Sequence, residues 1–402
     1  MTDHQEPFPS NDDTLIAAPP PKLLVASPTF GLTSEVWILR QLKHFKRVKP
    51  SLLYWKRATD ARPKMQYWEM STLGYQQLSQ HGWRRWIRRV RNVRSGNYAR
   101  GGRSEEQALE CILDASRPDV ILCHFGQVGL RLLPVARRTG VPIFIHFHGA
   151  DLSSWLSNRW YRRSLERCLQ DFDGVVVVGR HQYDWMRQRS VRPERLHYIP
   201  CGVPTAEFEP MARQPGNSVR YIAVSRLVPW KGVAESLRAF HQVLKQRRHD
   251  KLEIVGDGRE RPALEAYVRE HGLSDAVQFT GALSPAAVRE ALQRADIFLQ
   301  HSLTSTSGWV EGFGVSIAEA AAMGLPVIAT CSGGIPDQVV DDRTGVLIQE
   351  NDITAMASAM LQLANDRSRR LVMGKAGRDR MIRHFDSTQQ TATLEKALLS
   401  AL

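Results

Sequence analysis

Short apolar runs alternate with longer amphipathic stretches along most of this chain. Runs rich in β-branched residues predict strands, and the stretches between them repeat apolar positions with the helical period. Val175–Val178 is apolar throughout, as a central parallel strand is when helices cover both faces. The strands predicted in the first half are Leu23–Ala26, Val120–Cys123, Ile143–Phe147, Val175–Val178 and His197–Ile199, and the helices are Glu35–Phe45, Glu105–Ala115, Gly129–Arg138 and Trp160–Gln170.

The alternation pauses once, in a stretch rich in proline and glycine between residues 200 and 216. Such composition predicts a linker between domains. Beyond it the pattern resumes, with strands predicted at Tyr221–Val224, Leu252–Val255, Val277–Phe279, Ile297–Leu299, Val327–Ala329 and Val346–Ile348. The helices predicted there are Val233–Lys245, Pro262–His271, Ser284–Gln293, Val315–Met323 and Ile353–Ala364.

Strands and helices in this order predict parallel sheets with helices on both faces. The 402 residues suffice for two such units. We therefore predict two Rossmann-like, doubly wound α/β domains, 22–203 and 204–384, after a disordered leader, 1–21. Ligands bind at the carboxyl ends of parallel strands, so the residues that follow strands are the candidates for chemistry.

Composition narrows the class of protein. Hydrophobic residues make up 43% of the chain, and no apolar run approaches the ~20 residues that span a bilayer. The polar, acidic N-terminus does not resemble a signal peptide. The five cysteines lie far apart without a C-x-x-C motif, which argues against a disulfide framework or a cysteine-based zinc site. These features predict a globular protein of the cytoplasm.

The formal net charge of +13 is concentrated in one segment. Residues 84–103 contain eight arginines and no acidic residue, and an apolar stripe at helical spacing runs through the segment's start at Trp83, Trp86, Ile87 and Val90. One interpretation is a surface helix that packs on its own domain. Another is that 83–103 docks on an anionic membrane surface. Nucleic acid is not an expected partner, because no groove-reading motif is present.

Two cations follow the first strand of the second half. Arg226 and Lys231 flank a loop that opens a helix, and a helix N-terminus with added cations suits a pyrophosphate. The alternative is that both are solvated surface cations.

Two carboxylates frame a glycine-rich loop farther along. Glu311 precedes Gly312, Phe313 and Gly314, and a helix predicted from Val315 would direct its N-terminal amides at a ligand. Glu319, one turn into that helix, can reach back over the same face. Carboxylates accept hydrogen bonds from vicinal hydroxyls, so this pair favours sugar and ribose recognition. The alternative is that Glu319 only complements the helix dipole.

Histidines end the strand Ile143–Phe147. Alternation places His146 and His148 on one face of the strand, and Asp151 follows closely. A metal site needs a third ligand, which the neighbouring sequence does not offer, so we expect His148 to face the cleft and no metal to be bound. A further loop with Gly31 follows the first strand and is either part of the same cleft or a simple turn.

Taken in order, these motifs resemble glycosyltransferase family 4, whose members are retaining enzymes with the double-Rossmann GT-B fold. The similarity runs from about Leu23 to the C-terminus. Its strongest matches are the Arg226/Lys231 loop, the segment from Glu311 to Glu319 and His148–Asp151. Further matches are 199–203, 255–258, 279–281, 324–329 and 333–336. The start of the helix after the first strand resembles relatives that act on bacterial exopolysaccharides.

The resemblance implies a role for each site residue. Arg226 and Lys231 would hold the diphosphate leaving group, and Glu319 would bind the ribose. Glu311 would hold the donor sugar together with the amides of residues 312–314, beside Val315. His148 would bond to the transferred hexose. Asp151 would shape the cleft. The remaining expected substrate-binding residues are Gly31, Gly256, Phe279 and Leu283.

The implied function is transfer of a hexose from a nucleotide-diphosphate sugar, UDP- or GDP-hexose, to a glycan or lipid-linked acceptor in cell-surface polysaccharide biosynthesis. Neither a cofactor nor a metal is implied, because cations and helix dipoles neutralise the phosphates. The resemblance also implies that 385–402 forms a helix that packs back on the first domain. The enzyme is expected to work in the cytoplasm. If 83–103 docks on a membrane, that membrane is the inner face of the plasma membrane. Alternatives are an epimerase or phosphorylase on the same fold, or a non-catalytic nucleotide-sugar-binding protein.

Overall fold

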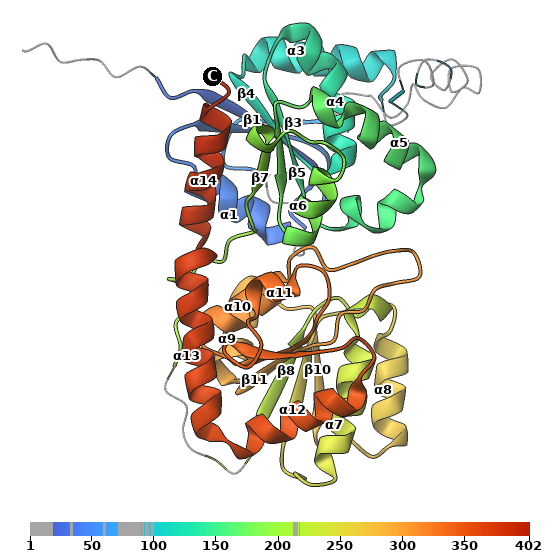
Figure 1. Cartoon of the computed structure of the whole chain (residues 1–402), viewed down its shortest axis with the longest axis vertical. Coiled ribbons are helices and arrows are strands. Elements are labelled where there is room, and N and C mark those ends of the chain that lie inside the picture. Colours follow the sequence, from blue (N-terminus) through green and yellow to red (C-terminus); the bar gives the residue numbers. More distant parts are fainter. Residues whose placement is uncertain are drawn as a thin grey trace, which may run out of the picture.

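Two parallel sheets organise the chain in a computed structural model, which describes residues 19–32, 35–58, 62–70, 90, 92, 96–97, 100–211, 216 and 218–402. Within these residues, one sheet has seven strands in the order β3-β2-β1-β4-β5-β6-β7. The other has six strands in the order β10-β9-β8-β11-β12-β13. The prediction of two Rossmann-like parallel sheets is confirmed. Figure 1 shows the two lobes stacked along the long axis, and we call them the N-lobe and the C-lobe.

The N-lobe is built around the first sheet. Its strands are β1 (Lys22–Phe30), β2 (Lys49–Arg57), β3 (Tyr67–Glu69), β4 (Val120–His124), β5 (Ile143–Phe147), β6 (Gly174–Val177) and β7 (Leu196–Tyr198). Its helices are α1 (Val36–His44), α3 (Arg103–Ser116), α4 (Gly126–Thr139), α5 (Arg159–Cys168) and α6 (Arg180–Arg187), with 3-10 turns η4 (Ala150–Leu152), η5 (Ser154–Ser157), η6 (Leu169–Asp171) and η7 (Pro193–Arg195). Strands β4 to β6 are buried at every position, as expected for central parallel strands.

The C-lobe repeats this plan. Its strands are β8 (Arg220–Val224), β9 (Lys251–Val255), β10 (Val277–Gly281), β11 (Ile297–Gln300), β12 (Val327–Thr330) and β13 (Gly345–Ile348). Its helices are η8 (Pro229–Lys231), α7 (Val233–Leu244), α8 (Arg261–Glu270), α9 (Pro285–Arg294), α10 (Val315–Ala322), α11 (Ile335–Gln338), α12 (Ile353–Asn365) and α13 (Arg367–His384). The predicted strands and helices of this half are all present, with ends that move by a few residues.

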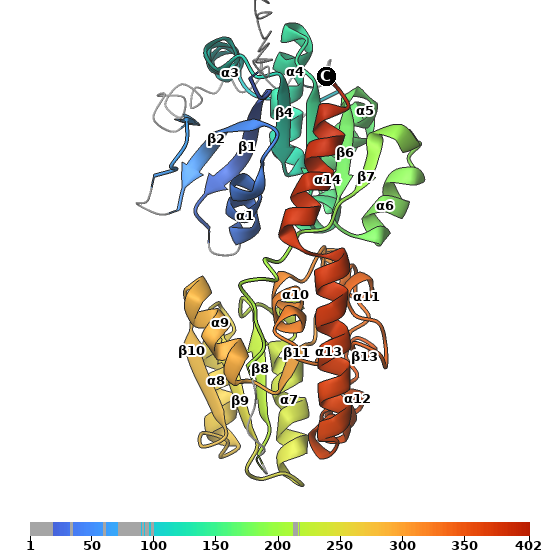
Figure 2. The same ribbon diagram turned by 90° about the vertical axis from the view of Figure 1, so that its left-hand side faces the viewer.

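The chain then returns to the N-lobe. Helix α13 packs on α10 of the C-lobe, and α14 (Ser387–Leu399) packs on α1 of the N-lobe. Figures 1 and 2 show these two helices running end to end along one side of both lobes. The Glu395 carboxylate of α14 accepts hydrogen bonds from the backbone amides of Lys46 and Arg47, each at 2.7 Å. This return ties the last helix to the first one.

Several elements were not predicted. Strands β2 and β3 form one edge of the first sheet, and helices α6 and α13 flank the two lobes. The interior of β2 is buried because β1 and β3 pair with it on either side. The predicted leader falls largely on residues 1–18, and most of the basic segment 83–103 also lies outside the described residues.

Candidate active site

Loops that follow strands of the two sheets meet between the lobes. The loop after β5 carries His148 and Gly149, and the loop after β11 carries Gly312. A Cβ atom on Gly312 would lie 2.1 Å from the His148 carbonyl oxygen and 2.7 Å from the Gly149 Cα atom. Only glycine permits such an approach of two backbones. The sites predicted on separate domains are therefore brought into direct contact.

Glu311 is the centre of a buried polar network at this contact. Its side chain is 7% exposed, and its Oε2 atom lies 2.5 Å from Lys231 Nζ. Gln300 Nε2 and Ser302 Oγ also donate to Oε2, at 3.1 and 3.3 Å. Ser316 Oγ on α10 in turn donates a 3.2 Å hydrogen bond to the side-chain oxygen of Gln300. Within the described residues, no hydrogen bond is made to the other carboxylate oxygen of Glu311, so Oε1 remains available as an acceptor.

The two predicted phosphate-binding cations differ in their surroundings. Lys231 ends η8 with its side chain 15% exposed, and its ammonium lies 5.0 Å from the centre of the Trp309 ring. Arg226 is exposed. It lies near Glu35, at the start of α1 in the N-lobe, where burial raises the pKa of the carboxyl to about 7 and the Arg226 charge opposes that rise. Arg226 of the C-lobe and Glu35 of the N-lobe thus lie near each other across the lobes.

Glu319 already has a partner in this structure. Arg40 of α1 reaches across from the N-lobe, and its Nη2 atom lies 2.6 Å from Glu319 Oε1. Burial raises the pKa of the Glu319 carboxyl, while Arg40 lowers it. Ribose hydroxyls at Glu319 would have to share the carboxylate with Arg40 or displace it.

The amides at the start of α10 were predicted to hold the donor. Those of Gly312 and Phe313 donate to no group among the described residues. In the amide orientation of Gln338 that satisfies both partners, its side chain pairs with Gly314, accepting from the backbone N–H at 2.9 Å and donating to the carbonyl at 3.0 Å. Phe313 is buried against Phe385, and Val315 begins the helix. Two free amides and the helix N-terminus therefore lie beside Glu311.

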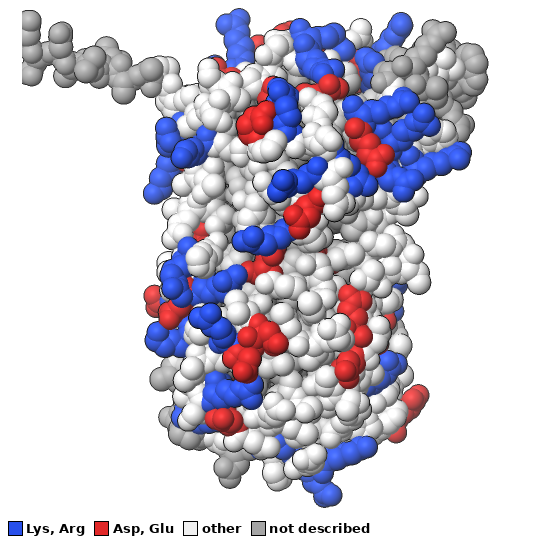
Figure 3. Space-filling model, in the orientation of Figure 1, with Lys and Arg blue, Asp and Glu red and all other residues white. Residues whose placement is uncertain are grey.

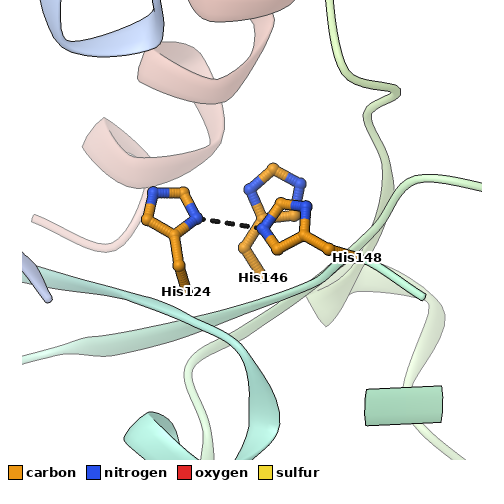
Figure 4. A group of neighbouring side chains, drawn as sticks. All are labelled: His124, His146 and His148. Atoms are coloured by element: carbon orange, nitrogen blue, oxygen red, sulfur yellow. Dashed lines mark hydrogen bonds between the residues drawn. The ribbon is translucent and has the colours of Figure 1, made fainter. Parts of the chain in front are cut away.

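His148 belongs to a cluster of three imidazoles. His124 at the end of β4 is the register partner of His146 on β5, so their side chains share a face with His148. His124 Nδ1 and His148 Nε2 lie 3.0 Å apart and share one proton (Figure 4). Burial lowers the pKa of all three imidazoles, that of His146 to about 3, so they are neutral.

Trp37 of α1 covers this cluster. Its ring centroid lies 3.8 Å from that of His148. The other ring nitrogen of His148, Nδ1, lies 3.9 Å from Cys201 Sγ. Because both nitrogens of His148 have protein neighbours, a hydrogen bond to a sugar requires this ring to turn.

Asp151 is fully buried and serves the backbone. Its carboxylate accepts hydrogen bonds from the amides of Gly149 at 2.9 Å, His148 at 3.1 Å and Gly126 at 3.3 Å. Burial raises its pKa to about 6, and these amides oppose the rise. Asp151 therefore shapes the turn that presents His148 rather than facing a ligand.

The other predicted residues lie on strands or shortly after them. Gly31 directly follows β1, and Gly256 directly follows β9. Phe279 is partly buried on β10, and Leu283 is partly buried in the loop after it. Gly31, Gly256 and Leu283 thus lie just beyond the carboxyl ends of their strands, where ligands of α/β sheets bind, whereas Phe279 lies in the middle of β10.

Five residues around the site were missed. Gln300 is the last residue of β11 and Ser302 lies two residues beyond it, so the rule that strand ends carry chemistry could have found them. Nothing local indicates Trp37, Arg40 or His124, because their partners lie on other elements or on the other lobe. Among the described residues, one group could hold a metal ion, and it is His124 with His146 and His148. The third ligand that the local sequence lacked thus comes from the neighbouring strand.

The surface carries a basic region on the N-lobe. Figure 3 shows Lys and Arg gathered on the upper lobe over α5. This helix exposes Arg159, Arg162, Arg163 and Arg167 beside a single acid, Glu166. Most of the segment 83–103 predicted to dock on a membrane lies outside the described residues. Among those described, no helix has both the length and the apolar character needed to cross a bilayer.

Two family models match consecutive parts of the chain. The model for glycosyl transferases group 1 matches residues 207–380, and that for glycosyltransferase family 4 matches residues 69–207. A protein named as a colanic acid biosynthesis glycosyltransferase, WcaL of Escherichia coli, is 30% identical over 71% of this chain and 71% of its own length. A GDP-mannose-dependent phosphatidylinositol monomannoside mannosyltransferase of Mycolicibacterium smegmatis is 32% identical over 65% of this chain and 71% of its own.

Solved structures share the architecture. Sucrose-phosphate synthase from Thermosynechococcus elongatus superposes with a TM-score of 0.73 at 17% identity, over 95% of this chain and all of its own. HepE of Anabaena, in complex with UDP and glucose, superposes with a TM-score of 0.71 at 16% identity, over 95% of this chain and all of its own. Sequence relatives and fold agree, and the chain belongs to glycosyltransferase family 4, with the GT-B fold.

Proposed function

We propose that this glycosyltransferase is a hexosyltransferase that uses a UDP- or GDP-hexose as donor and a glycan or lipid-linked acceptor in cell-surface polysaccharide or glycolipid synthesis. The names of its relatives support this choice, because they include a colanic acid enzyme and a GDP-mannose-dependent enzyme. The solved complex with UDP and glucose supports a nucleotide-sugar donor as well.

The observation that carries the proposal is the state of the Glu311 carboxylate. Three donors hold Oε2, one of them Lys231, and this leaves Oε1 free beside the unpaired amides of Gly312 and Phe313. A fixed acceptor oxygen next to two donors matches a sugar hydroxyl, which both donates and accepts. Lys231 keeps two ammonium protons for a phosphate. Sugar and diphosphate can therefore be held by one preorganised network.

The remaining residues are assigned by their places around this network. Arg226 binds the diphosphate with Lys231, and Glu319 binds the ribose. Phe279 and Leu283 line the position of the base. His148 bonds to the hexose after its ring turns. Asp151 holds the turn that carries His148. The donor can approach the backbone closely at Gly31, Gly256 and Val315, which lie at the ends of strands or at the start of a helix.

Transfer proceeds with retention in this proposal. The bond between the anomeric carbon and the β-phosphate oxygen breaks, and the acceptor oxygen forms its bond to the anomeric carbon on the same face. The acceptor proton passes to the departing phosphate oxygen. Arg226, Lys231 and the N-terminus of α10 stabilise the charge that develops on the diphosphate, so this step needs no metal ion.

The acceptor determines where in the cell the reaction takes place. A lipid-linked acceptor would place the enzyme at the cytoplasmic face of the plasma membrane. The exposed arginines of α5 and the arginines of 83–103 are suited to an anionic membrane surface. Nucleic acid is not proposed as a partner.

The test is transfer of label from UDP-[14C]glucose and GDP-[14C]mannose to a bacterial lipid extract. Lys231→Met should lower the rate by about 10²–10³-fold, because the charge that stabilises the leaving group is lost. Lys245→Met is the matched control, since Lys245 is exposed at the end of α7, and it should keep the wild-type rate. Wild-type activity in Lys231→Met would contradict the site.

Two further readouts of the same assay test the mechanism. The anomeric configuration of the product, read by NMR, should match that of the donor, and an inverted product would overturn retention. The rate should not fall when EDTA is added. A rate lost to EDTA and restored by Mg²⁺ would overturn the metal-independent step. Binding of the donor without any transfer would favour a nucleotide-sugar-binding protein instead.

A further inference from the structure

The histidine cluster has a geometry that packing alone does not require. His124 and His146 face each other across β4 and β5, and His148 follows two residues later on the same face. One ring nitrogen from each lies within 4.8 Å of those from the other two. Figure 4 shows the three rings gathered on one side of the strands.

Some of the ring nitrogens in this cluster lack partners. His124 Nε2 is buried without a hydrogen bond, and of the two buried nitrogens of His146 one faces the backbone of Ile199 while the other has no partner. His124 is fully buried and His146 is 2% exposed. A buried polar atom without a partner costs about 1–3 kcal/mol, so an apolar side chain would be the more stable choice if these positions served only to fill space. The unpaired nitrogen of His146, beside the close pair of His124 Nδ1 and His148 Nε2, therefore points to a ligand that accepts lone pairs.

The chemistry of the donors selects the ligand. Three neutral imidazoles and no carboxylate suit a first-row transition ion and exclude Ca²⁺ and Mg²⁺, which prefer oxygen. Three histidines are a known zinc donor set, and zinc–nitrogen distances of about 2.0–2.1 Å place the ligand atoms of a tetrahedral site about 3.4 Å apart. The 3.0 Å pair of His124 and His148 is close to this spacing, and the widest separation closes by small side-chain rotations.

We propose that His124, His146 and His148 bind one divalent transition metal ion, with zinc the best fit, and that the bound ion inhibits glycosyl transfer. The ion takes the place of the proton that His124 and His148 share, and the ring that carried this proton then holds its N–H on its other nitrogen. It thereby holds His148 against β4 and prevents the turn that a hydrogen bond to the hexose requires. Binding of the metal is independent of the proposed function, whereas inhibition rests on the assignment of His148 to the donor sugar.

Trp37 influences access to the site. Its ring stacks on His148 and lies 5.1 Å from the His124 ring, centroid to centroid. His148 is the one member of the cluster that is partly exposed. A metal ion therefore enters past His148.

The binding test is a titration of the full-length protein with Co²⁺, followed through visible absorption, and then competition with Zn²⁺. The wild type should bind one Co²⁺ with the intense bands of a four-coordinate site, and Zn²⁺ should displace it. His146→Leu should weaken binding at least 100-fold, and its melting curve shows whether it folds. His124→Asn, which keeps a partner for His148, provides a second variant should His146→Leu not fold.

A matched control comes from the surface. The partly buried His241 and the exposed His271 form a pair, with ring centroids 5.1 Å apart, that could bind a metal adventitiously. His271→Gln should leave the stoichiometry and affinity unchanged. Absence of a tight Co²⁺ or Zn²⁺ complex in the wild type, or equal affinity in His146→Leu, would overturn the metal site.

The inhibition test compares each protein in Zn²⁺ with the same protein in EDTA. The wild type should lose at least 90% of its rate in saturating Zn²⁺ and regain it in EDTA, and His146→Leu should lose much less. Tight zinc binding without inhibition would keep the site but contradict the inhibition and the role of His148 in donor binding. Transfer by a wild type that binds no zinc would overturn this inference and leave the proposed function intact.

Discussion

At the scale of residues, the site depends on charges that are buried together. Lys231 and Glu311 form an ion pair whose side chains are 15% and 7% exposed, and Gln300 and Ser302 share the same carboxylate oxygen. Removal of one partner of a buried pair leaves a charge without compensation, which is far more costly than loss of a surface pair. Preorganisation of this kind lets Lys231 meet a phosphate without reorganisation during the reaction.

Glu35 gives the site a pH dependence. Its pKa is raised to about 7 by burial near Arg226, so the carboxyl is neutral below pH 7 and ionised above it. The ionised form repels a diphosphate at Arg226. The donor KM of the wild type should therefore rise roughly fivefold between pH 6 and 8.5, as about 1 kcal/mol of repulsion implies. Glu35→Gln should show a flat profile of donor KM, and identical profiles for the two proteins would contradict this role.

The sequence predicted residues whose signal is local. Lys231, Glu311 and Glu319 follow strands or open helices within recognisable spacings, so their neighbourhood could be inferred. His124 and Arg40 could not, because each acts through a contact set by register or by the packing of the two lobes. A sequence pattern shows which element carries a side chain, but it does not show which distant side chain will contact it. His124 and His148 are 24 residues apart in the sequence, and Arg40 and Glu319 are 279 apart.

At the scale of elements, α1 joins the loop after β5 in reaching from the N-lobe to the donor residues. Trp37 covers the histidine cluster, and Arg40 pairs with Glu319 of α10. This helix was predicted from its amphipathic pattern. Helix α13 was not, because its basic residues and two glycines leave no clear apolar stripe, and its position depends on packing against α10 and α12.

Arg40 should set the pH dependence of stability. Burial raises the folded-state pKa of Glu319 above its ordinary value of 4.5, and Arg40 opposes the rise. In Arg40→Ala the pKa rises further, so the folded state holds a proton that the unfolded chain releases above pH 4.5. The deficit in unfolding free energy relative to the wild type should be small at pH 5 and grow toward about 3 kcal/mol at pH 8.

Urea unfolding at pH 5, 6.5 and 8 measures this deficit. Lys43→Ala is the matched control, because Lys43 lies on the exposed side of the same helix. It should show no such trend. A deficit for Arg40→Ala that is constant with pH would mean that the Glu319 charge does not depend on Arg40.

At the scale of the whole molecule, two chain crossings join the lobes at one place. Val203 donates its amide to the Phe385 carbonyl at 2.8 Å, and Ser387 donates to the Val203 carbonyl at 2.9 Å. Away from this hinge, the lobes meet through Arg40 with Glu319 and through Arg180 with Asp337, whose carboxylate accepts the Arg180 amide at 2.7 Å. Motion of the lobes therefore changes the site more than it changes either core.

Gly312→Ala tests the contact between the lobes. The added Cβ would lie 2.1 Å from the His148 carbonyl oxygen, so the loop or the lobe must shift. A misplacement of about 1 Å can cost about 100-fold in rate, which is the loss we expect, while both cores and the melting temperature are largely retained. Gly216→Ala, whose Cβ meets no atom of the described residues closer than 4.0 Å, should keep full activity. Full activity of Gly312→Ala would contradict the observed contact.

The central claim is that Arg226 and Lys231 of the C-lobe hold the diphosphate of a nucleotide sugar. Its most direct test is the melting temperature of the wild type, Lys231→Met and Lys245→Met in the presence of UDP, GDP, ADP and their hexose conjugates. A ligand that binds only the folded state raises the melting temperature by mass action. We predict a rise with UDP or GDP compounds for the wild type and Lys245→Met, and its loss in Lys231→Met. An equal rise in all three proteins, or none with any nucleotide, would contradict the account.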